Sequence, residues 1–88
     1  MIFIVLLRFR QKPTKARLAQ LDKNREQFVK EGGKIIGTYW TLGRYDSVTI
    51  TEAPDVKTAM KTLMRGSDMA STETLVALTR EEAIKLIE

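Results

Sequence analysis

The chain has 88 residues, no cysteine, no histidine and a formal net charge of +4. A chain of this length builds one hydrophobic core, so we expect a single domain over residues 1–88. Without cysteine or histidine, the chain has no residues for a disulfide, a zinc–thiolate site or a catalytic triad. We therefore expect neither a bound metal nor a cofactor.

The positive charge is concentrated in the first part of the chain. Residues 1–34 hold nine Lys and Arg against three Asp and Glu, whereas residues 35–88 hold six against eight. Five basic residues fall between positions 8 and 17, with no acidic residue among them. Such a run can bind an anion, but it is more often a solvated surface, and here only Phe9 adds an aromatic ring for stacking. Nucleic acid is therefore not an expected partner.

The first third of the chain predicts a strand followed by a helix. Residues 2–9 are apolar on both alternating faces, which is typical of a strand covered on both sides. This segment is too short to span a bilayer and lacks signal-peptide features, so we expect a cytoplasmic protein without membrane contact. Pro13 and Thr14 open a helix that ends at Gly32 and Gly33. The apolar stripe of this helix contains Leu18, Leu21, Phe28 and Val29, with Arg25 interrupting it.

The middle of the chain predicts a hairpin. Residues 34–42 and 45–52 are rich in β-branched and aromatic residues, and a short turn at Gly43 and Arg44 joins them. Because strand side chains alternate, the second strand presents two different faces. One face carries Ser47, Thr49 and Thr51, and the other carries Val48 and Ile50.

The last third predicts a second helix, a fourth strand and a short final helix. The helix begins at Pro54 and Asp55 and ends at Gly66, residues 72–78 form the strand, and residues 79–87 form the last helix. The order βαββαβ with an appended helix is that of the ferredoxin-like α+β fold, with a four-stranded antiparallel sheet. The expected apolar stripe of the second helix contains Val56, Ala59, Met60, Leu63 and Met64.

This topology leaves one face of the sheet uncovered, because both long helices lie on the same side. The open face keeps apolar side chains from residues 2–9 and at least one aromatic from residues 34–42. That is more apolar surface than a monomer usually exposes. We therefore expect a homodimer or a higher homo-oligomer, in which two sheets pack face to face as a dimeric α/β barrel.

The densest group of polar and aromatic side chains outside the expected core lies at the hairpin. Residues 39–46 contain the only Trp, both Tyr and an Asp. These side chains can wall a pocket for a small ligand. They can equally stabilise the hairpin, with Asp46 accepting backbone N–H groups at the turn. Arg8 on the first strand can pair with Asp46 or Glu52. The candidate ligand-binding residues are Tyr39, Trp40, Gly43, Tyr45, Asp46 and Arg8.

The hairpin and its surroundings resemble a known family. Residues 41–48 contain a G-x-Y-D element leading into a strand, and residues 52–55 then read Glu-Ala-Pro-Asp at the start of a helix. Together with the Thr-Glu-Thr-Leu of residues 72–75 and the helix stop at residues 32–34, they resemble the GYD domain family over most of the chain. The segments 10–13 and 68–71 depart from the family pattern.

The resemblance implies a small ferredoxin-like protein of the dimeric α/β-barrel type. It also implies that the motif positions are Gly43, Tyr45 and Asp46, and it supplies no reaction. The fold expected from the resemblance thus agrees with the fold expected from the element order.

Two classes of function fit these observations best, and nucleic-acid binding through the basic first part of the chain ranks third. The first, which we prefer, is a module that binds a small ligand or acts through assembly. The second is a cofactor-independent enzyme, similar to small monooxygenases or isomerases, with its pocket near the hairpin. Without histidine, its acid–base groups would come from Asp46, Glu52, Tyr39 and Tyr45, with Arg8 or Arg44 stabilising an anion.

Overall fold

The structure is a computed structural model that describes residues 1–87. The described residues form four strands and three helices. In chain order they are β1 (Ile2–Phe9), α1 (Lys15–Lys30), β2 (Lys34–Trp40), β3 (Ser47–Glu52), α2 (Val56–Arg65), β4 (Ala70–Ala77) and α3 (Arg80–Lys85). The predicted order of elements is confirmed.

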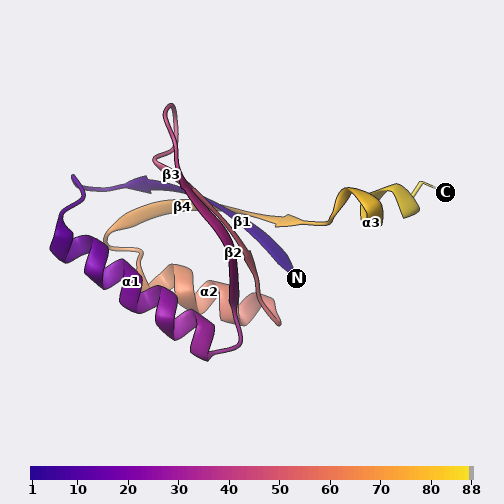
Figure 1. Ribbon diagram of the computed structural model, residues 1–88, viewed down its shortest axis with the longest axis horizontal. Helices are drawn as coiled ribbons and strands as arrows, with labels where there is room; N and C mark the ends of the chain where they lie inside the picture. Colours follow the sequence, from indigo (N-terminus) through magenta and orange to yellow (C-terminus); the bar gives the residue numbers. More distant parts are fainter. Residues whose placement is uncertain (88) are drawn as a thin grey trace.

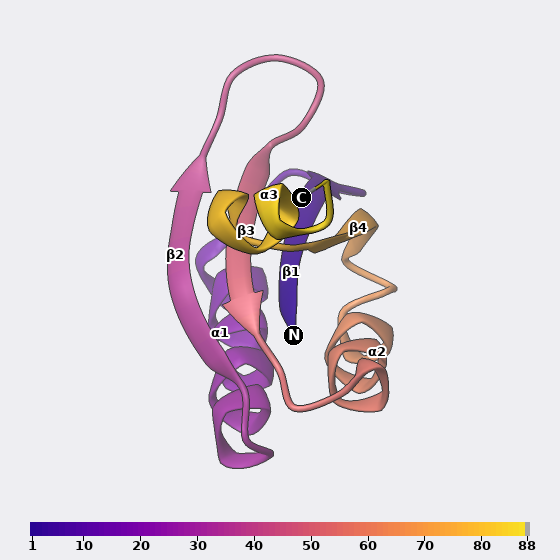
Figure 2. The same cartoon turned by 90° about the vertical axis from the view of Figure 1, so that its right-hand side faces the viewer.

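The four strands form one antiparallel sheet in the order β2-β3-β1-β4. Helices α1 and α2 both lie on one side of this sheet (Figures 1 and 2). This arrangement is the ferredoxin-like fold that the sequence predicts. Helix α3 projects beyond the end of β4, away from the rest of the chain (Figure 1). None of the helices in residues 1–87 is long and apolar enough to cross a bilayer.

The helices begin where their capping residues predict. The side chains of Thr14, Asp55 and Thr79 each accept a hydrogen bond from the backbone N–H three residues later. These bonds satisfy N–H groups that have no partner within a helix. The N–H and hydroxyl of Thr58 both donate to Asp55, at 2.8 Å each, and lower the pKa of its carboxyl group.

The link between β2 and β3 is longer than the predicted short turn. The strands end at Trp40 and begin again at Ser47, so residues 41–46 form a loop (Figure 2). The base of this loop is closed by Thr41, whose N–H donates to the Asp46 carbonyl at 2.9 Å and whose hydroxyl donates to the Tyr45 carbonyl at 2.6 Å. These bonds take the place of regular pairing between β2 and β3, which ends at Trp40 and Ser47. Gly43 within the loop has a φ of +107°, a positive value that glycine adopts without steric cost.

The phase of β3 decides the character of both faces of the sheet. Its hydroxyl residues, including Thr49 and Thr51, face the helices. Its apolar residues therefore face the other way, where Ile50 lies opposite Ile4 and Val48 lies opposite Leu6. The side towards the helices thus combines the odd-numbered apolar residues of β1 with hydroxyl groups from the three other strands.

The buried core is small and lies at one end of the sheet. Phe3 and Phe28 are 2% and 3% exposed, and they cluster with Ala53, Ala59 and the partly buried Ile35. Along the rest of the sheet the contact with the helices is looser. The accessible surface of 6480 Å² exceeds the value of about 5,200 Å² expected for a compact chain of 10.0 kDa.

Helix α2 presents a different face to the sheet from the one its apolar pattern predicts. Ala59 and Leu63 point inward as expected, but Val56, Met60 and Met64 are exposed. The inward face is completed instead by the buried Thr58 and the partly buried Thr62. Burial of Thr58 costs little because its hydroxyl donates to Asp55. In α1, Val29 is likewise 52% exposed, although its place in the apolar pattern predicts burial.

The last strand also differs slightly from its prediction. It begins at Ala70, two residues earlier than the pattern suggests, because Phe9 and Ala70 are still paired in the ladder between β1 and β4. Because β4 starts this early, every residue of β1 is paired with a residue of β4. Strand β4 forms one edge of the sheet and β2 forms the other.

A Gly33→Ala substitution should destabilise the fold. A Cβ atom at Gly33 would lie 2.4 Å from the ring of Phe28, so the ring would have to leave the core. We expect the free energy of unfolding to fall by about 1–3 kcal/mol in a urea titration. The matched control is Gly66→Ala, whose Cβ would have ordinary contacts at 3.7 Å. Equal stability of the two variants would contradict this account of the core.

Candidate functional site

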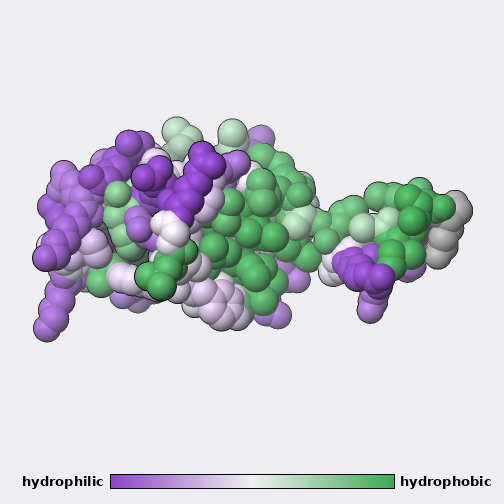
Figure 3. Space-filling view, turned by 90° about the horizontal axis from the view of Figure 1, so that it is seen from above, coloured by the Kyte–Doolittle hydropathy of each residue, from purple (hydrophilic) through white to green (hydrophobic). Residues whose placement is uncertain are grey.

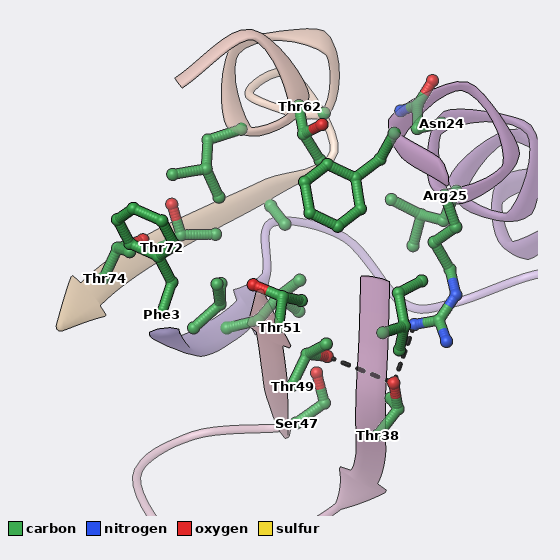
Figure 4. A pocket seen from close by; sticks show the side chains of 18 of the residues that line it. Phe3, Asn24, Arg25, Thr38, Ser47, Thr49, Thr51, Thr62, Thr72 and Thr74 are labelled. Carbon is green, nitrogen blue, oxygen red and sulfur yellow. Dashed lines mark hydrogen bonds between the residues drawn. The ribbon is translucent and has the colours of Figure 1, made fainter. Parts of the chain in front are cut away.

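A cavity of about 180 Å³ lies between the two long helices and the sheet (Figure 4). Its apolar wall includes Phe3 and Phe28 together with the inward leucines of α1 and α2. Its polar wall consists mainly of hydroxyl side chains. Those on the sheet are Thr38, Ser47, Thr49, Thr51, Thr72 and Thr74, and Thr62 extends from α2.

Several polar atoms at this cavity have no hydrogen-bond partner. Within residues 1–87, these atoms include the hydroxyls of Thr62 and Thr74 and the side-chain nitrogen of Asn24. All three are buried, and all three residues line the cavity (Figure 4). Buried polar groups in folded proteins are nearly always paired with protein or water. The cavity therefore offers both an apolar volume and free hydrogen-bonding groups.

Arg25 borders the cavity from α1. Its guanidinium donates to the hydroxyl of Thr38 on β2 at 2.8 Å, and the Thr49 hydroxyl lies 3.5 Å from the same oxygen (Figure 4). This contact explains how a charged residue fits the apolar stripe of α1. The stem packs beside the cavity while the charged end reaches the edge of the sheet. Asp22, the carboxylate of the cavity lining, is exposed.

The structure separates the candidate residues of the hairpin. Trp40 lines the cavity, and its ring lies 5.5 Å from the ring of Phe9 at an angle of 55°. Its neighbour Tyr39 points to the opposite face of the sheet, where it is 60% exposed and pairs with Val48. Gly43 sits in the exposed loop, with no atom within 4 Å of a Cβ built on it.

Asp46 ties the loop to the first strand. Its carboxylate accepts a hydrogen bond from the N–H of Phe9 at 2.8 Å, and its own N–H donates to the Leu7 carbonyl at 2.7 Å. The interpretation of Asp46 as an acceptor of backbone N–H groups is thus confirmed. Arg8 is exposed and, within residues 1–87, is not paired with this carboxylate. Glu52 is opposite Ile2, at the other end of β1, so Arg8 does not reach it either.

Tyr45 makes a contact across the open face of the sheet. Its hydroxyl donates to the carboxylate of Glu73 on β4 at 2.5 Å, and the Arg44 guanidinium lies 5.8 Å from its ring centroid. The hydrogen bond to Glu73, desolvation and the negative charge of Glu73 all raise the pKa of Tyr45. Arg44 and Arg8 act in the opposite direction but more weakly. The contact secures the loop over the sheet.

Most residues that line the cavity are not among the candidates predicted from the sequence. A signal was present, because the hydroxyl residues of β3 alternate strictly with its apolar ones, and β4 repeats the pattern at Thr72 and Thr74. The pattern does not say which set faces the helices. The usual expectation places the apolar set there.

Comparison with known families and structures supports the resemblance seen in the sequence. The model of the GYD domain matches residues 3–87. A comparison with curated proteins found no match. Among solved structures, protein TTHA0845 from Thermus thermophilus is 23% identical, with a TM-score of 0.54. The alignment covers 88% of this chain and 91% of that one, and it supports the fold.

Two further solved structures align over a similar length. The hypothetical protein PHS023 from Pyrococcus horikoshii is 17% identical to this chain, with a TM-score of 0.48. The alignment covers 90% of this chain and 94% of that one. A protein from Thermobifida fusca, described as dimeric, ferredoxin-like and of unknown function, is 15% identical. The alignment covers 86% of this chain and 89% of that one, with a TM-score of 0.47.

The phenol of Tyr45 should titrate late. Because Glu73 favours the neutral phenol, Tyr45 should lose its proton at a higher pH than an ordinary tyrosine side chain, which is visible as a late step in tyrosinate absorbance. A raised pKa makes this contact stabilising below the ordinary pKa of tyrosine, and the stabilisation disappears as the pH rises through the folded-state pKa. Glu73→Gln should move the late step to lower pH, and Tyr45→Phe should remove it. A late step that survives Tyr45→Phe would refute the assignment.

Proposed function

Since the chain belongs to the GYD domain family, whose fold it shares, we propose that it is a small-molecule-binding module with its ligand site between helices and sheet. The observation that carries this proposal is the cavity of about 180 Å³ in which buried hydroxyls lack partners. A tightly packed core would not leave such a volume empty, because both the void and the unpaired hydroxyls cost stability.

The cavity wall indicates what kind of molecule it suits. Phe3, Phe28 and the leucines give an apolar surface, which favours a hydrocarbon or aromatic body. The hydroxyls of Thr62 and Thr74 can each donate or accept one hydrogen bond, so a ligand with one or two polar atoms would satisfy them. Engineered cavities of similar volume hold a ring of benzene size, so the buried part of the ligand has roughly six to ten non-hydrogen atoms.

The alternative of a cofactor-independent enzyme has less support. Its acid–base candidates do not share the cavity, since Tyr39 and Tyr45 lie on the opposite face of the sheet and Asp46 is bonded to the backbone of Phe9. Glu52 lies at the far end of β3. The hydroxyl groups of the lining are suited to hold a ligand rather than to move a proton at neutral pH.

The second part of the proposal is that the module works as a homodimer joined through the open face of the sheet. This face carries the partly buried Ile4, Leu6, Val48 and Ile50 together with Leu75, which is 44% exposed. Figure 3 looks onto this side, where hydrophobic residues gather over the sheet and along the projecting arm. An apolar sheet face of this kind is self-complementary when two copies pack about a two-fold axis.

The projecting arm extends the proposed interface. Strands spaced about 4.8 Å apart and about 20 Å long give a projected face of roughly 400 Å² for the sheet alone. A stable interface commonly buries about 800 Å² on each partner. The arm, residues 78–87, adds Leu78, Leu86 and Ile87, which are 54%, 75% and 86% exposed. A second copy that receives the arm would bring the buried area into the required range.

Ligand binding can be tested with 1-octanol, because Trp40 is the only tryptophan and lines the cavity. Octanol should change the Trp40 emission and raise the melting temperature. Thr62→Leu should fill part of the cavity and remove an unpaired hydroxyl, so it should stabilise the free protein by about 1 kcal/mol and weaken octanol binding at least about tenfold. The control Met64→Leu, on the exposed face of the same helix, should change neither. Unaltered octanol binding by Thr62→Leu would contradict the proposed site.

Assembly can be tested by light scattering at micromolar concentration. We expect a dimer for the unmodified chain and a monomer for Ile50→Lys, because the substitution places a charge in the middle of the apolar face. The matched control is Val29→Lys on the exposed side of α1, which should remain a dimer. Circular dichroism checks that both variants are folded. A monomeric unmodified chain would rule out this interface.

A further inference from the structure

A groove opens at the end of the sheet where β1 and β2 finish. It is lined by Phe9, Arg10 and Lys12 from the end of β1 and the following loop, and by Trp40 and Asp46 from the hairpin. Phe9 and Trp40 also line the cavity between helices and sheet. Their rings, 5.5 Å apart, therefore form a wall common to the two hollows. A molecule that passes this aromatic pair would have one end in the cavity and the other in the groove.

The groove carries an excess of positive charge. Arg10 is fixed at its edge by a hydrogen bond from its Nε to the Ser67 carbonyl at 2.8 Å. Arg17 lies behind the loop and donates to the Lys12 carbonyl at 2.7 Å. In the part of the chain that the structure describes, the one ion pair joins Arg65 to Glu31, so Arg10 and Lys12 have no carboxylate partner.

Asp46 brings one negative charge to the groove, against the two positive charges of Arg10 and Lys12. The Asp46 side chain is turned to the backbone N–H of Phe9, from which it accepts a hydrogen bond at 2.8 Å. Helix α1 begins next to the groove and has no acidic residue in its first turn, so its positive end adds to the same field. An anionic group in the groove would therefore meet a net positive charge from Arg10 and Lys12, beside the aromatic wall of the cavity.

We propose that the ligand is an amphipathic organic anion, whose apolar body fills the cavity and whose carboxylate-like head lies in the groove at Arg10 and Lys12. This inference rests on the proposed ligand-binding function and specifies the class of molecule bound. It explains why the basic residues of the loop lie beside the aromatic pair instead of being spread over the surface. Trp40 would then lie between the apolar body and the anionic head of the ligand, so its fluorescence emission should respond to the binding of either part.

The experiment compares three probes that share parts of the proposed ligand. Octanoate has both an apolar body and an anionic head, 1-octanol has the same body with a neutral head, and acetate has the head alone. Using Trp40 emission and the melting temperature, we expect octanoate to bind about tenfold more tightly than octanol and acetate to have little effect. The preference for octanoate should decrease as salt is added, because salt screens exposed charges.

Substitutions at the groove separate recognition of the head from recognition of the body. Lys12→Gln should weaken octanoate about threefold, and the double variant Arg10→Gln/Lys12→Gln about tenfold, while both bind octanol as before. The matched control is Lys34→Gln, because Lys34 begins β2 and lies about 20 Å from its end at Trp40. This control should leave the binding of both probes unchanged.

The outcomes distinguish this inference from the function on which it rests. If octanol binds as tightly as octanoate, or if the groove variants weaken both probes equally, the anionic class is wrong while the cavity site stands. If neither probe binds, the cavity function fails and the inference fails with it. Tighter binding of octanoate that depends on Arg10 and Lys12 supports both.

Discussion

The alternation of side chains along β3 is the constraint on which the rest of this structure depends. Strand geometry sends successive residues to opposite faces, and here Ser47, Thr49 and Thr51 face the helices while Val48 and Ile50 face away. A hydroxyl face packs less completely against helices than a face of isoleucine and valine. The opposite face, by contrast, keeps apolar side chains that the helices do not cover. The alternation along this one strand thus creates both an internal cavity and an open apolar surface.

These two features connect stability to the proposed function. The small core of Phe3, Phe28, Ala53 and Ala59 holds one end of the layers together, and the remaining volume is left to a ligand. The open face and the arm expose apolar surface, which in the proposed dimer would contact a second copy of the chain. Under the proposed function, a ligand and a second copy would complete packing that the isolated chain leaves loose. The large accessible surface for its mass is consistent with that interpretation.

The sequence predicted the fold well because its signals are local. Thr14, Asp55 and Thr79 cap the helices as expected, and the glycines at 32 and 33 end α1. The candidate site was predicted less well. Trp40 lines the cavity, but Tyr39 lies on the other face of the sheet, since neighbours in a strand cannot share a face. Tyr45, in the loop, also lies over that other face, because its hydroxyl bonds to Glu73. Arg10 and Lys12 are exposed, as the sequence indicates, but sequence proximity does not reveal that Phe9 and Trp40 lie beside them in a groove.

By itself, the sequence determined the order of elements, the capped helix ends, the antiparallel hairpin and the family to which the chain belongs. It also established that these 88 residues contain neither histidine nor cysteine. Only the tertiary structure decided which face of β3 meets the helices, which stripe of α2 points inward, and that the cavity and the basic groove share Phe9 and Trp40. The physical reason is that periodicity and capping act over a few residues, whereas the choice between two faces depends on contacts between elements far apart in the chain.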